Sequence, residues 1–460
     1  MPKIVAGVDS STQSVKVVLR DAQSGELIAS TSRPHPDGTE VNPLEWKKAL
    51  DSALDELSNY EISAISIGGQ QHGMVALDKD GAVIRDALLW NDTRSDKAAH
   101  ELNHEIPDIH DRTGSKLVAS FTASKVRWLA DDEKSNAEKV AAIALPHDWL
   151  SWQLTGARDL STLFTDRSDA SGTGYFDSVN NEYCRDIFAT ALRNQRDVIL
   201  PKIIAPQSFG GETVTGIPIA AGAGDNAGAA LGLGAGVGDL VISLGTSGTA
   251  FAVSSTSTHD PSGEVAGFAD ATGNFLPLAC TLNAAKIFST VATTLGISFE
   301  EFSSLALNAP LGAEGLRIIP HFDGERTPNR PQARGLFYGI THANFTKANI
   351  ARAAIEGVIA GMVYATQAVE KLGVPYSRVL LIGGAAKNPA VQQIAADLFG
   401  KEIHVPPTGE YVADGAAKQA AWALSGNENP PQWSLGEVKE VSPTTQSEDV
   451  VESYMELIKA

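Results

Sequence analysis

The stretch GDLVISLGTSGTAFAVSS, residues 238–255, contains two apolar runs that flank a turn of glycine, serine and threonine. The stretch VDSSTQSVKVVLRD, residues 8–21, has the same order near the N-terminus. An apolar run that enters a small polar turn and leaves it again is typical of a β-hairpin. We interpret the two stretches as copies of one phosphate-binding hairpin, which predicts two lobes; a chance likeness is the alternative.

The residues around the first hairpin predict a small α/β unit. Period-two apolar runs at 4–8, 15–19 and 27–32 predict three strands in a meander. Residues 43–60 carry apolar side chains at helical spacing, and residues 62–69 predict a strand after this helix. Three strands, a helix and another strand therefore form the predicted core of the first lobe.

The residues after the second hairpin predict elements of the same classes. Residues 346–373 have helical spacing and end on Gly373, which is typical of a left-handed helix stop. Residues 378–400 predict a buried strand, a Gly-Gly turn and a helix that begins after Asn388 as its N-cap and ends at Gly400. The fold class is therefore α/β in both parts of the chain.

The length of 460 residues favours two large lobes or three ordinary domains over a single core. We expect a first lobe over residues 1–236 and a second over residues 237–460. Pro430-Pro431 precede a final polar segment that could pack on either lobe, and we expect residues 434–460 to return to the first.

The composition excludes several classes of protein. A formal net charge of −19 argues against a nucleic-acid partner, because binding to phosphates draws on clustered lysine and arginine. Cys184 and Cys280 lack the spacing of a metal or redox motif, and no apolar run approaches the roughly 18 residues of a membrane span. We therefore expect a cytoplasmic protein without a membrane partner; its oligomeric state is open, a homodimer included.

Glycine is concentrated before the second hairpin, in PIAAGAGDNAGAALGLG, residues 218–234. Residues 222–227 match the loose dinucleotide-binding fingerprint of Rossmann-type dehydrogenases. The Asp225 carboxylate would repel a pyrophosphate there, so a dehydrogenase is the least favoured interpretation. Two others remain. The glycines present Asp225 to a ligand at close range, or Asp225 caps the alanine-rich helix that follows.

Three turns resemble one another chemically. Residues 9–14 place a carboxylate, hydroxyls and backbone N–H groups at the end of a strand, and residues 245–248 do so without the acid. Turns of this kind bind anions without lysine, although each alone could be an ordinary polar turn. With a third glycine turn, Gly383-Gly384, they predict one nucleotide between two lobes.

Polar and aromatic side chains gather at two further strand ends. GQQHGMVALD, residues 69–78, has Gln70, Gln71 and His72 at the end of a strand, and ALLWNDTRS, residues 87–95, has Trp90, Asn91, Asp92, Thr93 and Arg94 at the end of the next strand. A lone histidine is usually structural, but an amide, an imidazole, a carboxylate and a guanidinium close together, with an aromatic face, suit a polyhydroxylated ligand.

In their order along nearly the whole chain, these motifs resemble the FGGY family of carbohydrate kinases. The motifs that carry the resemblance are GVDSSTQSVKVVLRD, GGQQHGMVALD, LLWNDTRS, LPHDWLSWQLTG, SDASGTGYFD, AGAGDNAGAALGLG, ISLGTSGT, FDGERTPNRPQARGLFYGIT and GGAAKNPAVQQIAADLFG. The resemblance implies two ribonuclease H-like lobes of the actin/hexokinase/Hsp70-like ATPase type, with ATP and a sugar in the cleft between them.

The resemblance also implies roles for single residues. Asp225 would be the base that takes the proton from the sugar hydroxyl, and Asp9 would help to hold Mg²⁺ through water. The residues implied at the phosphates are Ser11, Thr12, Gly245 and Thr246. Those implied at the adenosine are Gly383, Gly384 and Asn388. Those implied at the sugar are Gln71, His72 and Asn226.

The implied acceptor is a ketopentose, D-xylulose, which would be phosphorylated by ATP. Family members that act on xylulose commonly carry Met where this chain has Gln71, so ribulose, another ketose or gluconate remain alternatives. The Arg-Glu pair of glycerol-phosphorylating members is absent at Gln71-His72, which disfavours a polyol. From another class, a nucleotide-gated binding protein of the actin type would need no sugar contacts at Gln71, His72 and Asp225.

Overall fold

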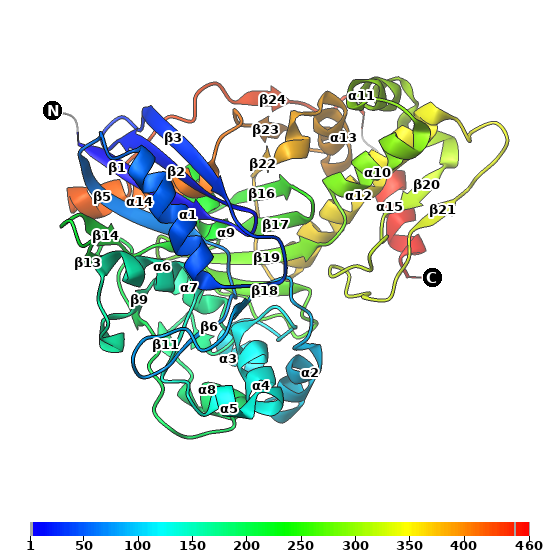
Figure 1. Cartoon of the computed structure of the whole chain (residues 1–460). Coiled ribbons are helices and arrows are strands. Elements are labelled where there is room, and N and C mark those ends of the chain that lie inside the picture. The colour runs from blue at the N-terminus through cyan, green and yellow to red at the C-terminus, as the bar shows by residue number, and fades with distance from the viewer. Residues whose placement is uncertain (1–2, 446–447, 460) are drawn as a thin grey trace.

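The computed structural model describes residues 3–445 and 448–459, which form two α/β lobes side by side (Figure 1). Each lobe is built on a seven-stranded sheet. The first sheet consists of β13 (Phe209–Glu212), β14 (Pro218–Ala220), β5 (Ile62–Gly69), β1 (Ile4–Ser10), β2 (Ser14–Asp21) and β3 (Leu27–Pro34) in that order, with β15 (Ala223–Gly224) beside β5. The second consists of β18 (Val265–Ala269), β19 (Phe275–Thr281), β17 (Gly248–Ala252), β16 (Asp239–Leu244), β22 (Arg378–Ile382), β23 (Ile403–Val405) and β24 (Lys439–Val441).

The two predicted hairpins occupy equivalent places in their sheets. In the first lobe, β1 is antiparallel to β2 and parallel to β5. In the second lobe, β16 is antiparallel to β17 and parallel to β22. The strands β1 and β16 are almost entirely buried, as central strands covered on both faces are. The interpretation of an internal duplication is therefore confirmed by topology.

The predicted helices form where capping residues and apolar spacing agree. Helix α1 (Pro43–Glu56) begins after Asn42, whose side chain accepts the N–H of Leu44, and it ends four residues before the predicted end at residue 60. Helix α12 (Lys347–Lys371) and helix α13 (Pro389–Phe399) form as predicted. Sidechain caps such as Asn42 satisfy N–H groups that have no partner inside the helix.

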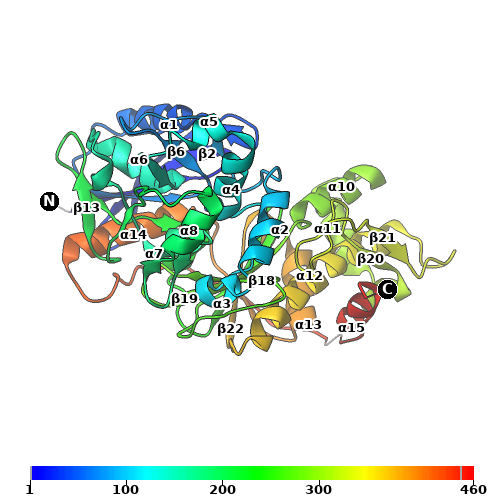
Figure 2. The same cartoon turned by 90° about the horizontal axis from the view of Figure 1, so that it is seen from below.

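A group of helices lies at the bottom of the molecule in the view of Figure 1, and Figure 2 shows the same helices from below. These helices are α2 (Asp96–Glu105), α4 (Thr122–Asp132) and α8 (Arg185–Leu192). One buried apolar cluster joins them to α9 (Asp225–Leu233) and to the face of β16, β17 and β18. The core is thus continuous from the helical group through the first lobe into the second sheet. None of the helices described is long and apolar enough to cross a membrane.

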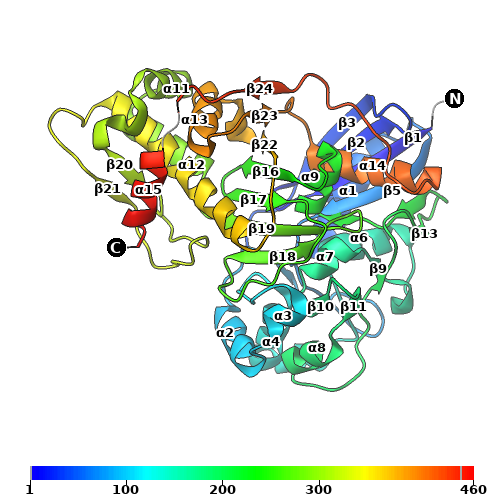
Figure 3. The ribbon, with the colours of Figure 1, turned by 180° about the vertical axis from the view of Figure 1, so that it is seen from behind.

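The C-terminal part of the chain crosses between the lobes earlier than predicted (Figure 3). Helix α14 (Tyr411–Ser425) packs against β1, β5 and α9 of the first lobe. Strand β24 then pairs with β23, and α15 (Glu448–Leu457) lies against α12, both in the second lobe. The expectation that residues 434–460 return to the first lobe is therefore wrong; α14 makes that return, because its alanine-rich surface fits closely against the sheet.

Glycines allow α14 and α9 to pack with their backbones in contact. A Cβ atom at Gly415 of α14 would lie 1.8 Å from the carbonyl oxygen of Gly228 in α9, and one at Gly232 would lie 2.1 Å from that of Tyr411. Such distances leave no room for any side chain. Part of the glycine cluster before the second hairpin therefore serves helix packing and not ligand binding.

Gly415→Ala is expected to lower the free energy of unfolding by about 1–3 kcal/mol, the usual cost of overpacking a closed interface. The matched control is Gly236→Ala, because a Cβ atom at Gly236 would meet no atom within 4 Å. Urea unfolding followed by circular dichroism measures both variants. Equal midpoints for the two would contradict the packing argument.

Candidate active site

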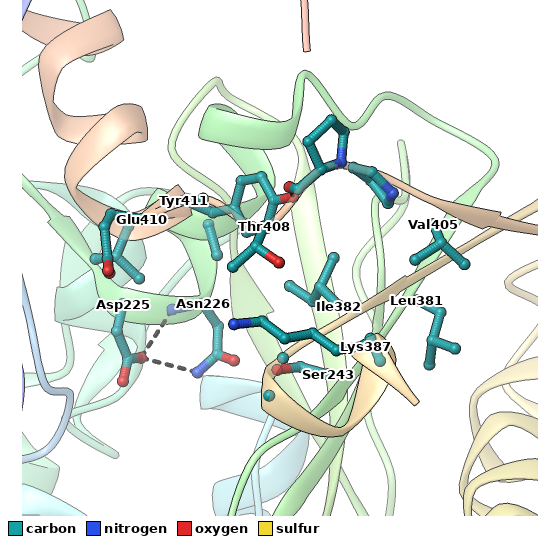
Figure 4. A pocket seen from close by; sticks show the side chains of 18 of the residues that line it. Asp225, Asn226, Ser243, Leu381, Ile382, Lys387, Val405, Thr408, Glu410 and Tyr411 are labelled. Carbon is teal, nitrogen blue, oxygen red and sulfur yellow. Dashed lines mark hydrogen bonds between the residues drawn. The ribbon is translucent and has the colours of Figure 1, made fainter. Parts of the chain in front are cut away.

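A cleft of about 750 Å³ lies between the lobes and collects residues from both (Figure 4). Asp9 at the end of β1 and Asp225 and Asn226 at the start of α9 line it from the first lobe. From the second lobe it is lined by residues that follow β22 and β23, among them Gly383, Gly384, Lys387 and the segment 405–410. Tyr411 and Val412 complete this wall at the start of α14.

Asp225 is the first residue of α9, directly after β15, and its carboxylate points into the cleft (Figure 4). Its Oδ1 accepts the backbone N–H of Asn226 at 2.7 Å and the Nδ2 of the same residue at 2.8 Å. Gly224 occupies the N-cap position, so Asp225 does not cap the helix. Burial raises the pKa of Asp225 to about 6, which makes this carboxylate a stronger base than an exposed one.

Asp9 is buried at the carboxyl end of β1, and its environment favours a cation. Burial raises the pKa of Asp9 to about 7, opposed by a hydrogen bond from the Ser11 hydroxyl at 2.5 Å and increased by the charge of Asp225. The neighbouring Ser10 hydroxyl is buried without a hydrogen-bond partner among the described residues. The Asp9 carboxylate lines the wide cleft, and a carboxylate there fits a hydrated Mg²⁺, which usually keeps several of its waters and needs few protein ligands.

The hydroxyls of the first hairpin turn already have partners within the lobe. Ser11 donates to Asp9, whereas the Thr12 hydroxyl accepts the indole N–H of Trp90 at 2.9 Å. In the second hairpin turn, Gly245 faces a smaller pocket and Thr246 is exposed at the tip. Ser11, Thr12 and Thr246 do not line the cleft, and Gly245 lines the smaller pocket and not the cleft.

The glycine turn after β22 lies between the cleft and a second cavity of about 730 Å³. Gly383 has φ 93°, and a Cβ atom there would lie 2.6 Å from the carbonyl oxygen of Leu244, so only glycine fits. Asn388 caps α13, and its Oδ1 accepts the N–H of Ala390 and the hydroxyl of Ser303. The cavity is also lined by the apolar side chains of Phe288, Phe299 and Leu307.

A pocket of about 230 Å³ adjoins the cleft and shares Asp225, Asn226 and Ser243 with it. Its other lining residues are Gln71, His72, Trp90, Gly245, Ser247, Thr249, Phe268, Leu278, Cys280 and Arg326. The volume suits a small polar molecule, and the wall alternates hydrogen-bonding groups with aromatic and aliphatic ones. The predicted sugar contacts Gln71, His72 and Asn226 thus come together beside Asp225.

His72 is held as a neutral hydrogen-bond acceptor. Burial lowers the pKa of His72 to about 3, with a further contribution from the charge of Lys125. Nδ1 of His72 lies 2.6 Å from the carbonyl oxygen of Gly172, so Nδ1 carries the proton and donates it. The ring packs against Phe121 and Phe268, which leaves Nε2 as an acceptor for a ligand hydroxyl.

A buried ion-pair cluster lies behind the site. His147, in α6 (Pro146–Thr155), has Nδ1 2.7 Å from Asp148 and Nε2 3.3 Å from Asp166. Burial alone would lower the pKa of His147, but the charges of Asp148 and Asp169 outweigh it and raise that pKa well above its ordinary value. His147 is therefore the cation of a closed cluster of carboxylates.

This cluster supports the segment that carries the base. Asp166 caps α7 (Arg167–Ser171) by accepting the N–H groups of Ser168 and Asp169. The Ser168 hydroxyl accepts the N–H of Gly224, directly before Asp225, at 3.1 Å, and the Ser168 carbonyl accepts the amide of Gln71 at 3.3 Å. The position of both site residues thus depends on α7.

Two cations of the site were not among the predicted residues. Lys387 extends across the cleft with its ammonium toward Asn226 (Figure 4), and Arg326 lines the smaller pocket. Each lies within a family motif, GGAAKN for Lys387 and FDGERTP for Arg326. Both residues belong to the second lobe and approach Asp225 only where the two lobes meet, so the motifs that contain them did not by themselves indicate a role in this site.

Comparisons with known proteins agree with the geometry. The model of the "FGGY family of carbohydrate kinases, N-terminal domain" matches residues 4–232, and that of the C-terminal domain matches residues 240–424. The xylulose kinase of Streptomyces coelicolor is 41% identical over 92% of this chain and 89% of its own, and that of Escherichia coli is 33% identical over 96% and 93%.

The crystal structure of xylulose kinase from Bifidobacterium adolescentis superposes with a TM-score of 0.92 at 42% identity and covers 99% of both chains. This likeness confirms the expected α/β fold of two ribonuclease H-like lobes. Two matching family models, in the expected order and over most of the sequence, identify the group to which it belongs. The chain is a member of the FGGY family of carbohydrate kinases.

Proposed function

We propose that the protein transfers the γ-phosphoryl group of ATP to the 5-hydroxyl of D-xylulose. The observation that carries this proposal is the place of Asp225, which lines both the large cleft and the pentose-sized pocket. A base at that junction can reach a sugar hydroxyl on one side and a phosphate on the other. The name of the 41% identical relative, xylulose kinase, supports the choice of sugar.

Asp225 acts as the general base. Its pKa of about 6 keeps it mainly ionised at neutral pH and still able to accept the proton of the attacking hydroxyl. Asn226 holds the carboxylate in place through two hydrogen bonds to Oδ1, and Oδ2 remains to take the proton. The sugar lies against Gln71, Asn226 and His72, whose Nε2 accepts a hydroxyl hydrogen bond.

The nucleotide occupies the cleft and the adjoining cavity. The adenosine lies against Gly383, Gly384 and Asn388, beside the apolar wall of the 730 Å³ cavity. Ser11, Thr12, Gly245 and Thr246 surround the terminal phosphates, with the Lys387 ammonium as an added cation. Phosphoryl transfer demands mainly positioning and neutralisation of charge, which these groups supply together.

Mg²⁺ fits the oxygen atoms around Asp9. When bound, it neutralises phosphate charge and orients the terminal phosphates. Asp9 would hold it through water. Burial raises the pKa of Asp9 to about 7, so a nearby cation would favour its ionised form. We also propose that the boundary between the two lobes lies at residues 236–237 and that α14, which packs against β1, β5 and α9, belongs to the first lobe.

A coupled assay of ADP formation tests the proposal with a panel of D-xylulose, ribulose, gluconate and glycerol. We expect D-xylulose to give the highest kcat/KM, and the phosphorylated product to be confirmed by mass spectrometry. A higher kcat/KM for another sugar would contradict the substrate. ATP hydrolysis unaffected by every sugar in the panel would instead favour a nucleotide-gated binding protein.

A further inference from the structure

The loop between β20 (Arg317–Ile319) and β21 (Leu336–Tyr338) is tied to the second sheet by a buried carboxylate. Oε1 of Glu325 accepts the backbone N–H groups of Leu282 at 2.6 Å and of Arg326 at 2.8 Å. Oε2 of Glu325 accepts the amide of Asn283 at 3.0 Å. Because Leu282 and Asn283 follow β19 directly, the backbone at Arg326 is held rigidly at the edge of the cleft.

The Arg326 side chain leaves this anchor and lines the 230 Å³ pocket together with Gln71 and His72 of the first lobe. Its positive charge helps to lower the pKa of His72 and also acts on Lys125 and Cys280. The guanidinium therefore lies near enough to His72, Lys125 and Cys280 for its charge to act on them. In the part of the chain that the structure describes, no carboxylate lies within 4 Å of it.

A half-buried guanidinium without a carboxylate partner presents up to five N–H donors to whatever fills the pocket. The groups around it complement it, because His72 is an acceptor and Phe268, Leu278 and Cys280 offer no hydrogen bonds of comparable strength. Hydroxyl and carbonyl oxygens of a sugar can accept several of these donors at once.

We propose that Arg326 is a sugar-recognition residue that binds the oxygens at the end of the ketose farthest from the phosphoryl acceptor, C1 and C2. This inference rests on the proposed function. With the 5-hydroxyl at Asp225, the rest of an extended pentose lies along the pocket that Arg326 also lines, and the proposal assigns C1 and C2 to the guanidinium. Arg326 belongs to the second lobe and Gln71 and His72 to the first, so the bound sugar bridges the lobes.

Arg326→Ala and Arg326→Lys test the contact, with Arg334→Ala as the matched control. Arg334 is an exposed arginine of the same loop whose side chain bonds only to backbone carbonyls of Gln332 and Ala333. We expect KM for D-xylulose to rise about 10-fold to 100-fold in Arg326→Ala, as for a lost hydrogen bond to a charged group. Lysine should rescue part of this loss, because it keeps the charge without the planar fork.

The binding of ADP and MgATP should be unchanged in both Arg326 variants, and circular dichroism establishes that they fold. A fall in kcat at unchanged KM would overturn the proposal and put Arg326 at the phosphoryl group. A KM equal to that of Arg334→Ala would overturn it as well.

A substrate that lacks one hydroxyl separates the two ends of the sugar. With 1-deoxy-D-xylulose, the ratio of wild-type to Arg326→Ala kcat/KM should be at least about 5-fold smaller than with D-xylulose. The deoxy sugar lacks the C1 hydroxyl that Arg326 binds, so removing the arginine costs less with this substrate. Equal ratios would overturn the assignment to C1 and C2. A wild-type enzyme that prefers another ketose would contradict the proposed substrate alone, and the same comparison would then be made on that ketose.

Discussion

Asp225→Asn is expected to lower kcat for sugar phosphorylation about 10²-fold to 10⁴-fold, the range for loss of a general base. The amide keeps an oxygen that can accept the two hydrogen bonds from Asn226, so the loop and the start of α9 should stay in place. It cannot accept the proton of the attacking hydroxyl. The coupled assay of ADP formation measures the loss, and turnover near that of the wild type would contradict the assignment.

The pH dependence of the same reaction gives an independent check. Because Asp225 must be ionised to accept a proton, wild-type kcat should fall as the pH drops through its pKa of about 6. The variant should lack this acid limb. The pKa of Asp225 is higher in the folded state than in the unfolded state, so this carboxyl group lowers the free energy of unfolding as the pH rises from the ordinary aspartate pKa through 6. Asp225→Asn should therefore be at least as stable as the wild type at neutral pH.

His147→Ala is expected to lower the free energy of unfolding by about 3–5 kcal/mol, the cost of removing one partner of a buried ion pair. The His147 side chain is 0% exposed and Asp148 is 1% exposed, so water cannot replace the lost cation. The loss of His147 should also disturb the site through α7, because Ser168 of this helix makes hydrogen bonds to both Gly224 and Gln71. Urea unfolding measures the stability.

The control for this variant is His100→Ala. His100 lies 3.7 Å from Asp96, but its side chain is 80% exposed, so its loss should change the free energy of unfolding by less than about 0.5 kcal/mol. Because the pKa of His147 is raised in the folded state, protonated His147 contributes fully to the free energy of unfolding at a pH below the ordinary histidine pKa. This contribution is lost as the pH rises through the raised pKa. The difference between wild type and His147→Ala should therefore shrink at alkaline pH, and a constant difference would contradict the ion-pair account.

The net charge of −19 is compatible with a polyanionic substrate because the site is built locally. In the proposed site, backbone N–H groups at the turns, the Lys387 ammonium and a metal near Asp9 would neutralise phosphates whatever the total charge of the protein. The absence of a basic patch in the sequence therefore argues against a nucleic-acid partner without arguing against ATP.

Elements with strong local signals were predicted well. The hairpin of β16 and β17 follows from alternation around small residues, and α13 follows from its Asn388 cap and the glycine at its end. Asp225, His72 and Gln71 could be found because strand ends carry their side chains to one edge of a sheet. Such signals depend on residues a few positions apart, which the sequence alone displays.

Contacts between distant segments could not be predicted in this way. The return of α14 to the first lobe depends on backbone contact with α9, and residues 434–460 offered no pattern that distinguished one lobe from the other. Arg326 and Lys387 face the pockets only because the lobes meet.

The sequence by itself determined the α/β class, the duplicated hairpins, the family and the acid at the centre of the site, because local spacing and motif order encode them. Only the tertiary structure decided which lobe receives each C-terminal segment, the raised pKa of Asp225 and the second-lobe arginine in the pocket beside Asp225. Burial and approach between segments hundreds of residues apart set these properties, and no local pattern contains them.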